Sequence, residues 1–192
     1  MPYHYDDPSL YAGQPACQET LYEYNQTRPS QTARRQELLR EMFAEIGAGC
    51  HVETPVHANW GCRHVHLGAG SYVNSSVTFV DDADIFVGED CLIGPNVVIA
   101  TAGHPILPVL RRNHYVYTLP VRIGNNVWIG SAAQIMPGVS IGDNTVIGSG
   151  SVVTSDIPAS VVALGVPCRV VREIGPHDAE FYTKGRRLDV AE

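Results

Sequence analysis

VGEDCLIGPNVVIATAGH (residues 87–104) and IGNNVWIGSAAQIMPGVSIGDNTVIGSGSVV (residues 123–153) repeat a unit of six residues. A branched aliphatic residue opens almost every unit, and a small residue, usually Gly, follows it. The openers keep one phase across the interruption, because residues 99 to 123 span four whole units. They are Val87, Ile93, Ile99, Ile123, Ile129, Ile135, Ile141, Ile147 and Val153.

A period of six fits neither an α-helix nor a simple strand, since residues i and i+6 share a face only where the chain turns a corner between them. It predicts a mainly β fold, a parallel β-helix in which each unit supplies one short strand and one bend. The branched openers fill the coil, and Gly or Asn near each bend relieves crowding and permits positive φ. The fifth residue of each unit is expected to be a second inward position: Cys91, Val97, Val127, Ala133, Val139, Thr145 and Ser151.

The pattern divides the chain into three segments. Residues 1–50 are expected to form an N-terminal helical segment, residues 51–165 the β-helix, and residues 166–192 a C-terminal extension without the repeat. The first coils of the β-helix are the less regular units LGAGSY, VNSSVT and FVDDAD, which begin at Leu67.

Two helices are expected in the N-terminal segment. Asp7 and Pro8 are suited to the cap and first turn of one helix. Residues 30–46 carry one apolar stripe and a charged exterior, and Gly47 is placed to cap their C-terminal end. We expect these helices to cover one end of the coil, because an open end would expose apolar side chains and strand edges.

Composition narrows the class of function. The 192 residues include 20 acidic and 13 basic side chains, a net charge of −7, which argues against broad nucleic-acid binding. No apolar run is long enough to span a bilayer and the N-terminal MPYHYDDPSL is polar, so we expect a cytoplasmic protein without membrane attachment. Five cysteines without a CxxC motif predict free thiols rather than disulfides or a thiolate metal site.

The interruption of the repeat carries the most informative histidine. TAGHP (residues 101–105) ends a unit, and residues 105–120 break the pattern before Ile123 resumes it. Because the phase returns intact, residues 105–120 are expected to form a loop that projects from one edge of a continuing coil. Such loops often carry the binding site of a repeat fold, which makes His104 a candidate for chemistry.

The chain resembles the galactoside and maltose O-acetyltransferase family of hexapeptide-repeat proteins. The likeness rests on TAGHP, on YTLPVRIGNNVWIGSAAQIMPGVSIGDNTVIGSGSVVTSDIP and GVPCRVVREI, and on the earlier YEYNQTRPSQ and NSSVTFVDD. The resemblance implies a left-handed coil and a homotrimer with active sites between neighbouring subunits. It also implies direct transfer of an acetyl group from acetyl-CoA to a hydroxyl of a galactoside, maltose, glucose or a related saccharide, without a metal ion.

The resemblance assigns the catalytic roles to His104 and Asn74. His104 would act as the general base that removes the proton of the acceptor hydroxyl, and an imidazole, with an ordinary pKa of about 6.5, can accept and return a proton near neutral pH. Asn74 would stabilise the oxyanion or position the acceptor. No covalent acyl-enzyme is required.

Acetyl-CoA is expected in a groove along the coil. The residues that the resemblance assigns to it are Trp128, Ser131, Ser149, Thr154, Ser155, Arg169 and Arg172. The two arginines would meet the phosphates, and Trp128, Tyr115 or Tyr117 could stack on the adenine or the sugar. The family often has Lys where this chain has Ser155, so we expect a weaker or rearranged phosphate contact there.

The acceptor site is matched by Asn59, Tyr72, Asn74 and Asp82. Asp6 and Asp7 are further candidates to reach a sugar hydroxyl. The segment WGCRH (residues 60–64) is one residue longer than the usual YGxN of the family, which changes the pocket at this place.

Two alternatives belong to other classes of protein. A γ-type carbonic anhydrase shares the repeat architecture and needs three histidines around zinc, and His64 and His66 lie on one strand face at i and i+2. A non-catalytic scaffold would use the coil as a binding surface, but it has no need of TAGHP followed by a long loop.

Overall fold

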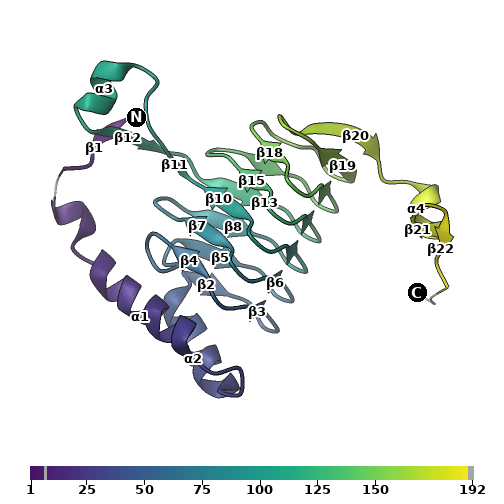
Figure 1. The fold of residues 1–192 in the computed structure, drawn as a ribbon, viewed down its shortest axis with the longest axis horizontal. Coiled ribbons are helices and arrows are strands. Elements are labelled where there is room, and N and C mark those ends of the chain that lie inside the picture. The colour runs from purple at the N-terminus through teal and green to yellow at the C-terminus, as the bar shows by residue number, and fades with distance from the viewer. Residues whose placement is uncertain (7, 190–192) are drawn as a thin grey trace.

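The structure, a computed structural model that describes residues 1–6 and 8–189, is a stack of triangular coils with a helical pair at one end (Figure 1). Three parallel sheets form the walls, and the chain visits them in turn. The first face contains β2 (Glu45–Ile46), β5 (Val65–Leu67), β8 (Ile85–Val87), β13 (Val121–Ile123) and β16 (Ser140–Ile141). The second contains β3 (His51–Val52), β6 (Tyr72–Val73), β9 (Leu92–Ile93), β14 (Trp128–Ile129), β17 (Val146–Ile147) and β19 (Val161–Leu164). The third contains β4 (His57–Ala58), β7 (Thr78–Val80), β10 (Val98–Ala100), β15 (Gln134–Ile135) and β18 (Val152–Val153).

The hexad openers form aliphatic ladders inside the coil. Every third opener returns to the same face, so Ile93, Ile129 and Ile147 pair in register on the second face and are buried. The residues predicted as second inward positions are also buried, with Cys91, Ala133, Thr145 and Ser151 fully enclosed. The predicted parallel β-helix is confirmed.

Two different requirements explain the small residues at the bends. The fourth residue of most hexads has positive φ, as at Asn96 (59°), Asn126 (53°) and Asn144 (57°), where asparagine tolerates the left-handed region. The glycine in second position faces the coil above it. A Cβ at Gly88 would lie 2.6 Å from the carbonyl carbon of Gly124, which is closer than packed atoms allow.

Gly88→Ala is therefore expected to lower the free energy of unfolding by about 1–3 kcal/mol, because the backbone of the next coil must shift to admit the methyl group. Gly175→Ala is the matched control, since a Cβ there meets no atom within 4 Å. Its expected cost is below about 1 kcal/mol. Denaturant titration of the two variants checks this, and equal stabilities would contradict the close-stacking role of Gly88.

The N-terminal helices cover the first coil, as predicted. A 3-10 turn, η1 (Pro8–Tyr11), leads into α1 (Gln14–Gln26), and α2 (Thr32–Met42) returns beside it. The Tyr24 hydroxyl donates a hydrogen bond of 2.6 Å to the Val52 carbonyl, and the buried Arg35 guanidinium donates one of 2.9 Å to the same oxygen. The apolar stripes of both helices are buried against the coil at Leu21, Tyr24, Leu38, Leu39 and Met42.

The second helix is shorter than predicted. It ends at Met42 rather than residue 46, because residues Glu45–Ile46 already pair as β2 with β5, ahead of the expected start of the coil at residue 51. Gly47 is accordingly not a helix cap, and a Cβ there would lie 2.3 Å from the Ala69 nitrogen of the next coil. The proposed cap Asp7 lies outside the described residues.

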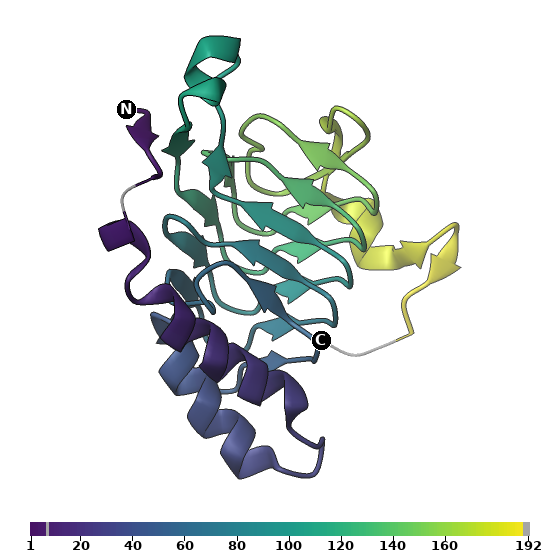
Figure 2. The same ribbon diagram turned by 60° about the vertical axis from the view of Figure 1, so that its left-hand side comes forward.

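The interruption is a β-hairpin that stands out from the coil (Figure 2). Its strands are β11 (Ala102–Gly103) and β12 (Tyr115–Thr118), joined through a short helix, α3 (Pro108–Arg112). The N-terminal β1 (Tyr3–His4) pairs with β12 and makes a third strand. The coil then resumes at β13, whose Val121 pairs with Ile85 of the previous coil.

The C-terminal segment turns back on the last coil. β20 (Arg169–Glu173) pairs antiparallel with β19, at the end of the stack opposite to α1 and α2 (Figure 1). A helical turn, α4 (Pro176–Glu180), and a small hairpin, β21 (Phe181–Thr183) with β22 (Arg186–Arg187), follow. Among residues 1–6 and 8–189, no helix has the length and apolar character needed to cross a membrane.

Candidate functional site

Most of the predicted site residues fall on two edges of the coil, which flank the third face. The first, here called the serine edge, consists of the turns after β6, β9, β14 and β17 and carries Asn74, Ser131 and Ser149. The second, here called the histidine edge, consists of the turns after β4, β7, β10, β15 and β18. It carries Asn59, Asp82, His104, Thr154 and Ser155. Within one chain, the structure therefore does not bring His104 and Asn74 together.

His104 lies directly after β11, where the hairpin leaves the histidine edge. Its side chain is exposed, and its Nδ1 lies 3.4 Å from the Tyr115 carbonyl oxygen of the paired strand. A carbonyl only accepts, so in the neutral ring this long contact favours the tautomer with the hydrogen on Nδ1 and the lone pair on Nε2. The ring of Tyr5 lies edge-on to the imidazole at 6.3 Å.

The N-terminal residues hold the hairpin. The Asp6 carboxylate accepts from Nδ1 of His114 at 2.7 Å, and Tyr5 stacks on the same imidazole at 5.2 Å. The Tyr5 backbone N–H also donates to the His114 carbonyl at 3.1 Å. Asp6 therefore fixes the loop that carries His104, while Asp7, the other proposed acceptor contact, lies outside the described residues.

Asn74 is oriented by its own turn. Its Oδ1 accepts a hydrogen bond of 2.8 Å from the Ser75 backbone N–H. Within the described part of the chain, its Nδ2 has no hydrogen-bond partner, which leaves this amide as a donor at the surface. Tyr72, two residues earlier, stacks on His51 with ring centroids 5.5 Å apart, and burial together with the nearby Glu53 raises the pKa of its phenol.

The serine edge continues from Asn74 as a row of donors. Ser131 follows Gly130, and the next coil places Ser149 so close that a Cβ on Gly130 would lie 2.7 Å from the Ser149 Oγ. The backbone N–H groups of Ser131 and Ser149 have no acceptor in residues 1–6 and 8–189. Trp128 lies beside this row on the outer surface of the second face and is 53 % exposed.

The two predicted phosphate ligands lie on β20. Arg169 donates to the carbonyl of Cys168 at 2.7 Å. Arg172 makes a bidentate pair with Asp178, with both N–O distances 2.7 Å, and this pair lowers the pKa of the Asp178 carboxyl to about 2. Asp178 would thus compete with a bound phosphate for Arg172. Thr154 and Ser155 lie on the histidine edge instead, so the structure does not bring them together with Ser131 and Ser149 in one chain.

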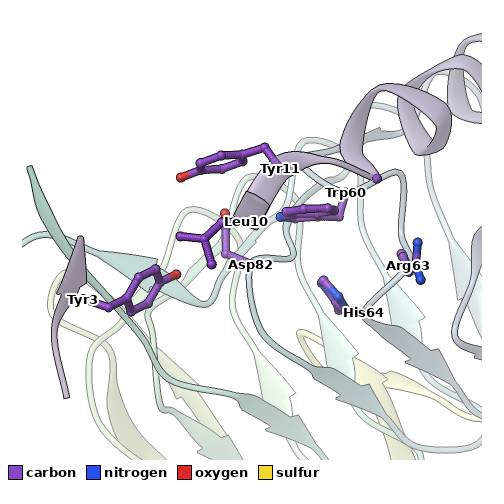
Figure 3. A pocket seen from close by; sticks show the side chains of 8 residues that line it. Tyr3, Leu10, Tyr11, Trp60, Arg63, His64 and Asp82 are labelled. Atoms are coloured by element: carbon purple, nitrogen blue, oxygen red, sulfur yellow. The ribbon is translucent and has the colours of Figure 1, made fainter. Parts of the chain in front are cut away.

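A pocket of about 450 Å³ adjoins the histidine edge (Figure 3). Asp82, predicted at the acceptor site, lines it and accepts a hydrogen bond of 2.8 Å from Asn59. Its other main lining side chains, Tyr3, Tyr11, Trp60, Arg63 and His64, were assigned no acceptor role by the sequence. The extra residue in WGCRH was the one sequence signal of a changed pocket here. Only the fold shows that Trp60 of this segment stacks on Tyr11.

His64 and His66, the basis of the carbonic anhydrase alternative, are engaged separately. His64 contacts the Asp81 carbonyl at 2.6 Å, whereas His66 lies between Glu45 (3.0 Å) and Asp84 (3.3 Å) on the first face. In the described ranges, no three His, Cys, Asp or Glu side chains are arranged to hold a metal ion. This geometry does not favour a zinc site.

All five cysteines are free thiols. Four of them are buried, and this burial raises the pKa of Cys50, Cys62, Cys91 and Cys168. The thiolate is the reactive form of cysteine, and a raised pKa disfavours it. These four side chains therefore serve to pack the core.

Comparison with known proteins places this arrangement among acyl-transferring enzymes. Residues 1–47 match the maltose acetyltransferase hexapeptide capping motif, and residues 120–155 match the bacterial transferase hexapeptide family. The chain is 48 % identical to galactoside O-acetyltransferase of Escherichia coli (strain K12), over 88 % of this chain and 83 % of the relative. A galactoside acetyltransferase in complex with coenzyme A superimposes with a TM-score of 0.95 at 43 % identity, over 98 % of this chain and 94 % of the other. A hexapeptide-repeat acetyltransferase from Vibrio cholerae O1 biovar eltor, complexed with acetyl-CoA, gives a TM-score of 0.84 at 30 % identity, over 88 % and 91 %.

Proposed function

Because the chain belongs to the galactoside and maltose O-acetyltransferase family of hexapeptide-repeat proteins, we propose that it moves an acetyl group directly from acetyl-CoA to a sugar hydroxyl. It is an acetyltransferase, and acetyl-CoA is its co-substrate. We propose that the acceptor is a galactoside, maltose, glucose or a related saccharide, and we propose the roles of individual side chains below. The observation that carries it is the exposed His104 with Nε2 available at the base of the hairpin.

His104 is the proposed general base. Its Nε2 accepts the proton of the sugar hydroxyl while that oxygen attacks the thioester carbon. The same nitrogen then returns the proton to the departing thiolate, so the imidazole ends the cycle neutral. The Tyr115 carbonyl supports this role because it holds the hydrogen on Nδ1.

Asn74 is the proposed donor to the oxyanion that forms during attack. Its Oδ1 is occupied by the Ser75 N–H, so the amide is oriented with Nδ2 available to donate. A preoriented donor of this kind stabilises the transition state by about 3–4 kcal/mol.

The proposed site is composite. His104 and Asn74 lie on different edges of one chain, so a site with both needs the serine edge of one subunit against the histidine edge of another. Such head-to-tail contacts close into a ring, and a homotrimer is the proposed ring. Exposed apolar side chains on the hairpin, Ile106 at 91 %, Leu107 at 57 % and Val109 at 46 %, support a subunit contact there.

Acetyl-CoA is proposed to run along the serine edge. The free N–H groups of Ser131 and Ser149 are suited to the amides of the pantetheine arm, with Trp128 beside them. Thr154 and Ser155 would approach from the neighbouring subunit. Arg169 and Arg172, at the far end of the second face, would meet the phosphates.

Replacing both Arg169 and Arg172 with Ala is expected to raise the KM for acetyl-CoA by about tenfold with little change in kcat, because two exposed cation–phosphate contacts are lost. Asp178→Asn is the matched opposite change. It releases Arg172 from its bidentate partner and should lower the same KM. Steady-state kinetics, with Arg40→Ala as control, measures all three, and an unchanged KM in the double variant would contradict the assignment.

The experiment that tests the function is release of free CoA thiol from acetyl-CoA across a panel of mono- and disaccharides. We expect acceptor-dependent release and an O-acetylated sugar in the product by mass spectrometry. No release with any sugar would contradict the proposed acceptor class. The cytoplasmic location stays a prediction from the sequence.

A further inference from the structure

We propose that the pocket between η1 and the WGCRH turn is a second acceptor subsite, which binds an anionic group attached to the acetylated sugar. This inference rests on the proposed acetyl transfer and adds a substrate class to it, acidic glycosides. Three observations carry it: the position of the pocket relative to His104, its aromatic walls and the opposite charges at its two ends.

The pocket leads away from the catalytic edge. Tyr3 lines one end and belongs to β1, which pairs with the hairpin that carries His104. Figure 3 shows Tyr3 at one end and Arg63 at the other, with Asp82 and Trp60 between them. A sugar hydroxyl at His104 would therefore direct the rest of the acceptor along the pocket toward Arg63.

Aromatic side chains provide the walls. Trp60 and Tyr11 are nearly parallel, at 13°, with ring centroids 6.2 Å apart, and both are partly exposed. Such surfaces stack on the apolar face of a pyranose or on an aryl group. The Trp60 backbone N–H donates 2.7 Å to the buried Asp81 carboxylate, which fixes the turn beneath its ring.

The ends of the pocket differ in charge. At the catalytic end, Asp82 with Asn59 offers acceptors and donors for sugar hydroxyls. At the far end, the Arg63 guanidinium forms no salt bridge with a carboxylate in residues 1–6 and 8–189, and it donates one long hydrogen bond, of 4.0 Å, to the Cys17 sulfur. The Nδ1–H of His64 donates to the Asp81 carbonyl at 2.6 Å, so the other ring nitrogen is an acceptor for a ligand hydroxyl, and the affinity of this end for a carboxylate comes from Arg63. In a chain of net charge −7, this end suits a carboxylate and the Asp82 end opposes one, so the orientation of an acidic ligand is fixed.

The test compares phenyl β-galactoside with 4-carboxyphenyl β-galactoside, which differ only in the carboxylate; the matching β-glucosides extend the pair. We expect the native enzyme to favour the carboxylate by about fivefold in kcat/KM, since an exposed charge-assisted contact contributes about 1 kcal/mol. In Arg63→Gln the ratio should fall to near one, Arg63→Lys should retain part of it, and Arg40→Gln, on the outer side of α2, should keep the native ratio. A native ratio of one, or a ratio unaffected by Arg63→Gln, would overturn the subsite while leaving acetyl transfer intact.

Calorimetric binding of 4-carboxyphenyl β-galactoside separates the subsite from the chemistry. Binding that is weakened about fivefold by Arg63→Gln and not by Arg40→Gln supports the pocket even where neither glycoside is acetylated. Such binding without acetylation of either glycoside would contradict the proposed function and leave the subsite intact. Equal affinity of native protein and Arg63→Gln would contradict the inference.

Discussion

His104→Ala is expected to lower kcat for sugar acetylation by about 10²–10⁴-fold, the usual contribution of a positioned general base. The KM for acetyl-CoA should change little, because the imidazole is proposed to act on the acceptor hydroxyl and is not among the proposed acetyl-CoA contacts. Thiol release in the presence of saturating acceptor measures the effect.

His57→Ala is the matched control, since His57 lies exposed on the third face and has no proposed role. Its kcat should equal that of the native protein. Equal rates for His104→Ala and native protein would remove the base mechanism, whatever the acceptor.

Mixing two inactive variants is expected to restore activity. In His104→Ala the Asn74 half of each site is intact, and in Asn74→Ala the His104 half is intact. If each site takes one residue from each of two neighbouring subunits, random assembly of equal amounts leaves about a quarter of the sites with both residues, so about a quarter of native activity should return. Dissociation and joint reassembly, followed by thiol-release assay, measures it.

Each variant taken alone through the same cycle is the control and should stay inactive. The two variants need different affinity tags, so that sequential purification demonstrates mixed assemblies before the assay. Mixed assemblies without recovered activity would contradict a site shared between edges. The outcome does not depend on the number of subunits, because each site in any closed head-to-tail ring samples two neighbours.

The coil was predictable from sequence because it is built locally. Each hexad contains its own inward aliphatic residue and its own bend, so the phase of Ile93, Ile129 and Ile147 sufficed to place them inside the coil, where they are buried. The end of α2 was not predictable in the same way. Ile46 continues the apolar stripe of the helix, yet its backbone pairs with Leu67 in the first coil, and only the tertiary contact decides between the two.

The site was predictable only in part for a related reason. TAGHP and the break in the repeat made His104 a candidate, because both are visible along the chain. The stacking of Tyr11 on Trp60 joins residues that no local pattern connects. The division of Asn74 and His104 between two edges likewise follows from counting three strands per coil, which the period of six alone does not supply.

The pairing of β1 with the hairpin has a practical consequence for anyone who purifies this protein. Tyr3 and His4 are hydrogen-bonded strand residues, and Asp6 is tied to His114, so the first six residues belong to the support of His104. An affinity tag fused immediately ahead of Tyr3 would crowd that support and, given the proposed role of His104, depress activity for reasons unrelated to any mutation under study. A tag after the small C-terminal hairpin avoids the problem, since β22 ends on the far side of the coil from this strand (Figure 2).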